Sequence, residues 1–171
     1  QSDATQAYCQ ADPGGQKTWI RMSENRWSES WKEFKDPVVP LIKALYGHLN
    51  FGAYWEERCH KKVIQEVFQQ IGESGEWRAC YVHHTLVIIL VIYVDDFKMA
   101  VPKDVEEKGW ALLKEGRGAI NMDPPTPIDA YLGFKNTIGT LSDNGVVGRT
   151  INYDMRSFLE QCLDSYQQLT G

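Results

Sequence analysis

The feature that most constrains the fold is an apolar run at residues 86–94, which ends in two adjacent carboxylates, Asp95 and Asp96. The run is rich in β-branched residues and apolar on both faces, which predicts a central strand. A second apolar segment at 97–101 follows directly, so the two predict a hairpin with residues 94–96 at its tip. The run is far shorter than the roughly 18 residues expected of a membrane span.

The rest of the chain mixes strands with amphipathic helices. Helical spacing of apolar residues predicts helices over 52–70, 104–114 and 153–169, with Asp104 as an N-cap. Strands are predicted in an opening segment at 1–10, at 18–22, 38–42, 80–82 and 128–134, and in a hairpin at 142–145. This order predicts an α+β fold, an antiparallel sheet with helices packed on one face. The length of 171 residues predicts a single domain, 1–171.

The acidic pair points to a metal site. Two neighbouring carboxylates repel each other, and a strand tip offers no structural interaction that offsets this repulsion. Divalent cations neutralise such pairs, and hard oxygen ligands suit Mg²⁺. A third carboxylate from another strand normally completes a two-metal site for nucleotidyl transfer. Asp3, at an apparent strand end, is the natural candidate, with Tyr8 placed beyond it.

Net charge and cysteine usage narrow the function further. The formal net charge of -5 disfavours a self-sufficient nucleic-acid binder, because phosphate contacts need a basic surface. It is compatible with the carboxylate-bearing part of such a protein. The four cysteines show no paired spacing, which indicates reduced thiols in an intracellular protein.

Four motifs occur in an order that resembles the reverse transcriptases, and the Leu-Tyr-Gly element resembles the Ty1/copia retrotransposons in particular. The motifs are Asp3-Ala4-Thr5-Gln6-Ala7-Tyr8, Lys43-Ala44-Leu45-Tyr46-Gly47, Tyr93-Val94-Asp95-Asp96 and Tyr131-Leu132-Gly133. The resemblance runs from about Asp3 to Tyr166, essentially the whole chain.

The resemblance implies a ferredoxin-like polymerase palm with RNA-directed DNA polymerase activity. Asp3, Asp95 and Asp96 would be catalytic and hold Mg²⁺ or Mn²⁺. Tyr8, as the sugar gate, would contact the nucleotide together with Ala4, Asn50 and Tyr93, and Leu132 and Gly133 would lie near the primer terminus. The implied partners are an RNA or DNA template with its primer, a dNTP, and the fingers, thumb, ribonuclease H and integrase segments of a polyprotein. The implied location is cytoplasmic or nuclear, including virus-like particles.

One stretch departs from the family pattern. Where the family continues Leu-Lys-Gln-Ala-Pro after Leu-Tyr-Gly, this chain carries Leu49 for Lys, Asn50 for Gln and Gly52 for Pro. This favours an alternative, a catalytically inactive relic or co-opted scaffold that keeps the palm fold. The chain also begins two residues before Asp3, so fingers, thumb and ribonuclease H are expected on other segments, and the fragment alone is expected to be inactive.

Other readings of single features remain open. Asp95 and Asp96 could form a solvated hairpin tip, or the acidic pair of a receiver domain with Asp129 as phosphoacceptor. A zinc site is a further alternative, although its candidate ligands lack paired spacing: Cys59, His60, Cys80, His83 and His84. Lys61 and Lys62 indicate a solvated helix face, or a contact to backbone phosphate.

Overall fold

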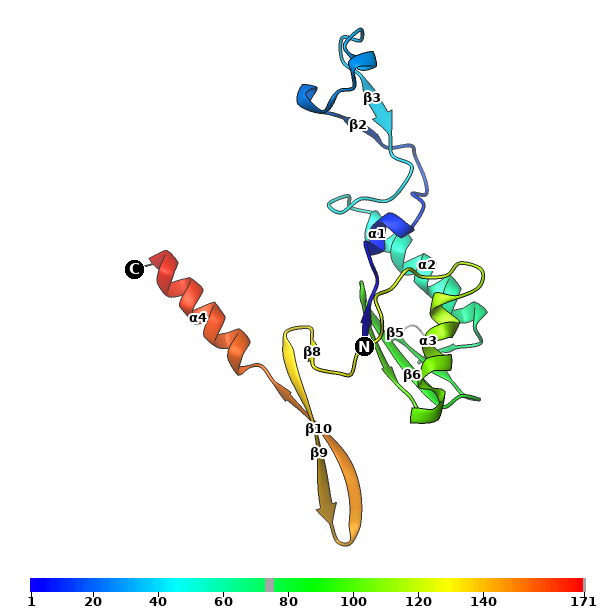
Figure 1. Ribbon diagram of the computed structural model, residues 1–171, viewed down its shortest axis with the longest axis vertical. Coiled ribbons are helices and arrows are strands. Elements are labelled where there is room, and N and C mark those ends of the chain that lie inside the picture. Colours follow the sequence, from blue (N-terminus) through cyan, green and yellow to red (C-terminus); the bar gives the residue numbers. More distant parts are fainter. Residues whose placement is uncertain (73–75, 171) are drawn as a thin grey trace. The chain divides into compact units, whose positions relative to one another are not determined.

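A computed structural model describes residues 1–72 and 76–170, and the chain forms two compact units (Figure 1). Residues 3–123 form the first, here called the α/β unit. Residues 1–2 and the chain from Pro124 onward form the second, here called the hairpin unit. The three aspartates of the predicted site belong to the α/β unit.

A five-stranded sheet organises the α/β unit. Its strands are ordered β1 (Ser2–Asp3), β7 (Asp96–Ala100), β6 (Ile88–Tyr93), β5 (Trp77–His83) and β4 (Gln69–Ile71). The pairs β4–β5, β5–β6 and β6–β7 are antiparallel. The predicted hairpin and the central position of β6 are confirmed. The turn is shorter than predicted, because Asp96 pairs with Tyr93 and belongs to β7.

One face of this sheet is buried under two helices, α2 (Phe51–Gln65) and α3 (Glu106–Lys114). Alternate residues of β6 are buried, and they share one core with aromatic and aliphatic side chains of both helices: Ile88, Leu90 and Ile92 with Trp55, Val63, Trp110 and Leu113. The predicted helix-covered face is therefore confirmed. Gly109 permits the close approach of α3, because a Cβ there would lie 2.8 Å from Met99 Sδ.

Some predicted boundaries are wrong for local reasons. The opening segment is a strand only at Ser2–Asp3, because Gln6 (φ 50°) turns the chain into α1 (Ala7–Gln10). Helix α2 ends at Gln65 rather than at residue 70, since Val67 is left-handed (φ 64°) and β4 then pairs with β5. Asp104 is no N-cap. It lies in a 3₁₀ turn (Lys103–Val105), and the N-cap position of α3 is Val105.

A second correction concerns Lys62, which is not on a solvated face. Its side chain is buried, and its ammonium donates to Glu66 Oε1 and to the Glu115 carbonyl, both at 2.6 Å. Lys61, one residue earlier, is exposed and pairs with Glu57 as a solvated helix face predicts.

A two-stranded ribbon lies between α1 and α2 in the chain. It pairs β2 (Trp19–Arg21) with β3 (Val38–Pro40) antiparallel. A strand is predicted in each of these two segments, and Pro40 ends the second one. Short 3₁₀ turns at Glu24–Arg26 and Glu29–Trp31 occupy the connection.

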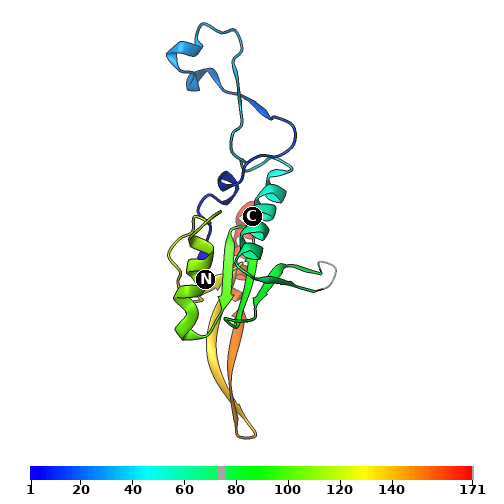
Figure 2. The same ribbon diagram turned by 90° about the vertical axis from the view of Figure 1, so that its right-hand side faces the viewer.

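The hairpin unit contains β8 (Ala130–Tyr131), β9 (Phe134–Asp143), β10 (Val146–Asp154) and α4 (Arg156–Thr170). Figure 2 shows β9 and β10 as a long ribbon with a tight end. That end is Asn144-Gly145, both with positive φ, as the predicted hairpin requires. The strand predicted over 128–134 is instead divided by a turn at Leu132-Gly133. Helix α4 starts after residue 153 because β10 still pairs with β9 there.

The architecture is thus α+β, with antiparallel sheets and four helices in the described residues. The antiparallel sheet removes the receiver-domain alternative, whose doubly wound fold requires a parallel one. Within residues 1–72 and 76–170, no helix has both the length and the apolar character that crossing a membrane requires.

Candidate active site

The β6–β7 turn consists of two residues, Val94 and Asp95, between the paired residues Tyr93 and Asp96. Val94 adopts φ 56°, a left-handed conformation that β-branched residues rarely occupy. Trp55 of α2 reaches this turn and donates its indole N–H to the Val94 carbonyl at 2.6 Å. A strained residue held by a buried aromatic side chain is typical of a functional site.

Asp3 and Asp96 lie on neighbouring strands, β1 and β7. Because Phe97 is fully buried, strand alternation directs the preceding Asp96 to the open face of the sheet. The Asp95 carbonyl accepts a hydrogen bond of 2.7 Å from the Ala4 N–H, which fixes the hairpin tip beside the segment after β1. The three predicted aspartates are therefore brought to one end of the sheet.

The electrostatics of Asp96 reflect this grouping. Burial raises the pKa of the Asp96 carboxyl, and the charges of Asp3 and Asp95 raise it further. A hydrogen bond with the Asp3 side chain acts in the same direction. Each of these influences opposes a negative charge on Asp96, which is the situation that a bound cation would relieve.

The carboxylates are not assembled into a finished metal centre. Among the residues that the structure describes, no group of three or more His, Cys, Asp or Glu side chains is arranged to hold a metal ion. Asp3 and Asp96 are the pair in mutual contact, and Asp95 acts on Asp96 through its charge. The donor set still has the oxygen chemistry that Mg²⁺ or Mn²⁺ prefers.

Two aromatic rings lie next to the aspartates. Tyr8 of α1 stacks on Tyr46, with ring centroids 4.3 Å apart and planes at 20°. Burial raises the pKa of the Tyr46 hydroxyl, and the nearby charge of Asp95 adds to the increase. Sequence reasoning placed Tyr8 in the site but gave Tyr46 no role. The Leu-Tyr-Gly motif was the available signal for it.

A cavity of about 330 Å³ lies behind the turn, between α2 and the sheet. Its lining combines aromatic and aliphatic side chains with a few polar ones: Tyr8, Gly52, Trp55, Glu56, Cys59, Arg78, Ala79, Tyr81, Ile92, Tyr93 and Val94. Tyr8 and Tyr93, both predicted to contact a nucleotide, thus share one cavity. Burial raises the pKa of the lining thiol Cys59 to about 12, which keeps it neutral.

The other predicted nucleotide contacts are divided. Ala4 is buried, and its backbone forms an isolated antiparallel bridge with Met122. Asn50 is exposed at the N-cap position of α2, and its side chain makes no capping hydrogen bond. Gly52 lies close to Tyr8, since a Cβ there would lie 3.5 Å from the Tyr8 hydroxyl oxygen.

Leu132 and Gly133, predicted to lie near a primer, belong to the hairpin unit. They form the two-residue turn between β8 and β9, with φ values of 51° and 79°. Positive φ at both positions matches a type I′ turn. Their contact with a primer stays a prediction.

The candidate zinc ligands have other partners. His60 Nδ1 lies 3.2 Å from the Tyr81 hydroxyl, and His84 Nε2 lies 3.2 Å from Gln69 Oε1. His83 Nδ1 accepts a hydrogen bond from the Leu86 N–H. All four cysteines are free thiols.

Comparison with protein-family models, with curated proteins and with solved structures finds no match to this chain.

Proposed function

We propose that the chain is the palm of an RNA-directed DNA polymerase, of the reverse-transcriptase kind that occurs in Ty1/copia retrotransposons. The observation that carries the proposal is the contact of Asp3 with Asp96 on neighbouring strands of an antiparallel sheet, with the charge of Asp95 beside them in the hairpin turn. A polymerase palm needs acidic groups at the edge of a surface that can receive a primer. The ferredoxin-like form of the fold is part of this proposal.

The chain's own residues have distinct tasks in the proposed reaction. Asp3 and Asp96 would supply the first oxygen ligands of Mg²⁺ or Mn²⁺, and Asp95 would add charge beside them. The metal, when bound, would favour the ionised primer 3′-hydroxyl and neutralise the departing diphosphate. Trp55 holds the hairpin tip through the Val94 carbonyl. The Tyr8 ring offers a flat surface for a nucleotide sugar.

Metal binding tests the proposal directly. Mn²⁺ titration followed by electron paramagnetic resonance should show weak binding to the native chain. Asp96→Asn and Asp3→Asn should each reduce the affinity by roughly tenfold or more, because each removes a charged ligand. Asp104→Asn is the matched control, since Asp104 lies in a 3₁₀ turn outside the site. Equal Mn²⁺ binding by Asp96→Asn and Asp104→Asn would exclude the proposed site.

A second candidate is the catalytically inactive relic or co-opted scaffold. It is favoured by the absence of an assembled metal-binding group in the described part of the chain, and by the exposure of Leu49 and Asn50. Primer extension separates the two candidates. We expect no extension by this chain alone, because a net charge of -5 gives little hold on a duplex. Extension should appear when fingers and thumb segments are joined to it.

Two further outcomes of the primer-extension assay distinguish a polymerase whose template pocket has decayed from a scaffold that never catalyses extension. If the joined protein is inactive and Asn50→Gln with Gly52→Pro restores extension, the template pocket has decayed. If no such repair restores it and Mn²⁺ binding is also absent, the chain is a scaffold.

A further inference from the structure

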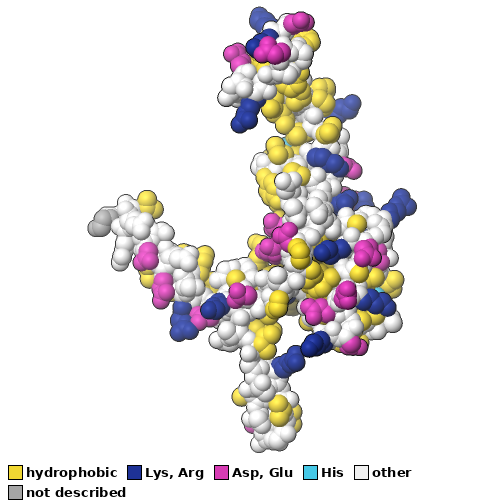
Figure 3. All heavy atoms as spheres, in the orientation of Figure 1, with side chains coloured by type: hydrophobic (Ala, Val, Ile, Leu, Met, Phe, Trp, Pro, Cys, Tyr) yellow, Lys and Arg dark blue, Asp and Glu magenta, His cyan; other side chains and the backbone are white. Residues whose placement is uncertain are grey.

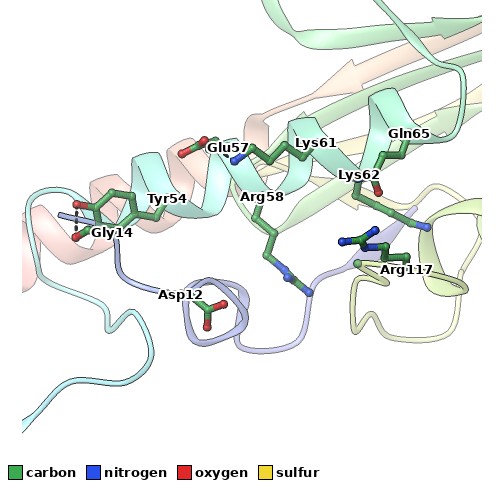
Figure 4. A pocket seen from close by; sticks show the side chains of 10 residues that line it. Asp12, Gly14, Tyr54, Glu57, Arg58, Lys61, Lys62, Gln65 and Arg117 are labelled. Atoms are coloured by element: carbon green, nitrogen blue, oxygen red, sulfur yellow. Dashed lines mark hydrogen bonds and ion pairs between the residues drawn. The ribbon is translucent and has the colours of Figure 1, made fainter.

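A second site candidate lies away from the aspartates, in a groove of about 570 Å³ between α2 and the loop that follows α3 (Figure 4). Its lining is dominated by charged side chains: Asp12, Gly14, Tyr54, Glu57, Arg58, Lys61, Lys62, Gln65, Arg117 and Gly118. Figure 3 shows cationic and acidic side chains intermixed over the visible face of the α/β unit.

Most charges in the groove are already neutralised. Lys61 pairs with Glu57, and the buried Lys62 pairs with Glu66. Asp12 pairs with Lys43, whose ammonium holds the pKa of that carboxyl below its usual value. The surplus positive charge belongs to two arginines, one on α2 and one on the facing loop.

Arg58 is the arginine on α2. Its side chain is half-buried, and one Nη donates to the Ala119 carbonyl at 3.1 Å. Its Nε is buried and has no hydrogen-bond partner among the described residues. A guanidinium has five N–H donors, so this one is anchored in place with donors unused. Figure 4 shows it extending from α2 toward the loop.

Arg117 is the arginine on the loop. It lies between Gly116 and Gly118, which have φ values of 74° and 73°. Glycine alone adopts this conformation at little cost, so the Gly-Arg-Gly sequence sets the position of the arginine. Arg117 is exposed and forms no ion pair within residues 1–72 and 76–170. In Figure 4 its guanidinium points back toward α2.

We propose that this groove binds a phosphate-bearing anion between Arg58 and Arg117. Neither guanidinium forms an ion pair among the described residues, although the Asp12 carboxylate lies near enough to Arg58 to be influenced by its charge, so both arginines have N–H donors to offer an oxyanion. The planar donor fork of arginine matches phosphate oxygens in pairs. Their two positive charges match two successive phosphodiesters of a nucleic-acid strand, and they would neutralise most of the charge of a diphosphate. The proposal does not depend on the polymerase assignment.

Calorimetric titration of the full chain with sodium diphosphate, in buffer containing EDTA, tests this site without metal at the aspartates. We expect binding that Arg117→Gln weakens roughly tenfold, the usual effect of losing one charged hydrogen-bonding partner. Lys108→Gln is the matched control, because it removes one exposed positive charge from α3 outside the groove. Asp95→Asn should also bind normally, which separates this site from the aspartates.

The source of the phosphate is identified by a competition experiment. If a nucleic-acid strand is the ligand, a fluorescent single-stranded oligothymidylate should bind in the same groove. Diphosphate should then displace it from the native chain, whereas the fluorescence of the oligothymidylate mixed with Arg117→Gln should not change when diphosphate is added. Diphosphate binding without oligothymidylate binding identifies the free anion instead. No diphosphate binding at millimolar concentration, or equal binding by Arg117→Gln and Lys108→Gln, overturns the proposal.

Discussion

Val94, at the tip of the acidic hairpin, offers a test of whether this turn stores backbone strain. A left-handed conformation costs an L-residue roughly 1–2 kcal/mol, and Val94 adopts φ 56°. Glycine reaches the same conformation without that cost. Val94→Gly should therefore recover strain energy that Val94→Ala cannot recover.

The loss of the valine side chain acts in the opposite direction. Val94 is 39% exposed, so 61% of its surface is covered. Complete burial of a valine contributes about 1.5–3 kcal/mol, so its partial burial here contributes about 1–2 kcal/mol. Alanine loses most of this and keeps the strain, whereas glycine loses it and removes the strain. We expect the free energy of unfolding to fall by about 1–2 kcal/mol in Val94→Ala and by less than about 1 kcal/mol in Val94→Gly.

Urea unfolding of both variants measures the difference, and Ile89 provides the control pair. Ile89 lies in β6, is 48% exposed, and is not left-handed. Glycine in a strand is less stable than alanine by about 0.5–1 kcal/mol, so Ile89→Gly should be the weaker variant there. The order must reverse at position 94. If Val94→Gly unfolds more easily than Val94→Ala, the turn holds no strain of the kind inferred.

Three further predictions concern the core and the site. Lys62→Ala should lower the free energy of unfolding by about 2 kcal/mol, because it removes a buried side chain together with its hydrogen bonds to the Glu66 carboxylate and the Glu115 carbonyl, whereas Lys61→Ala should change it by less than about 0.5 kcal/mol. Gly109→Ala should destabilise by about 1 kcal/mol, since crowding of Met99 outweighs the better helix propensity; equal or higher stability in urea would contradict this. The pKa of Asp96 lies above its ordinary 3.8 in the folded chain, so the folded state binds this proton more tightly and the ionised carboxylate opposes folding. Asp96→Asn should therefore unfold at a higher temperature than the native chain at pH 7, and calorimetry should show the difference vanishing below pH 3.8.

The parts of the fold that could be predicted are those with strong local patterns. The β-branched residues of the apolar run before Asp95 favour a strand, and Asn144-Gly145 favours a two-residue hairpin turn. The pairing of β1 with β7 required more, because a strand of two residues has no period of its own. Its position came from the chemistry expected of Asp3 rather than from any pattern around it.

The errors share a cause in long-range contacts. Lys62 follows Lys61 in an ordinary amphipathic pattern, and nothing near it in sequence indicates burial. Its partner carbonyl, at Glu115, is contributed by a segment 53 residues away. The predicted end of α2 is wrong for the same reason. The helical spacing of apolar residues continues to residue 70, but residues from Gln69 onward pair with β5 as strand β4.

The sequence points to the carboxylates of the candidate site and to two of its aromatic residues, Tyr8 and Tyr93, but not to Trp55 or Tyr46. Adjacent carboxylates are conspicuous in a sequence, because their repulsion needs an explanation. A tryptophan in an amphipathic helix needs none, and the hydrogen bond from Trp55 to Val94 appears only once the helix is packed on the sheet. The stack of Tyr46 on Tyr8 likewise joins residues whose spacing indicates no contact.

The departure at residues 49–53 bears on which of the two candidate functions is correct. Gly52 is the second residue of α2, within the first turn, where proline is tolerated because the backbone N–H has no helical acceptor. A proline there would nevertheless approach the Tyr8 hydroxyl, which lies 3.5 Å from the position of an added Cβ. Tyr8 itself stacks on Tyr46, and the charge of Asp95 contributes to the raised pKa of the Tyr46 hydroxyl. A proline at position 52, as in the family pattern that the chain resembles, would press on the Tyr8 ring and through it on Tyr46, so it would change the shape of the candidate site without changing the acidic residues.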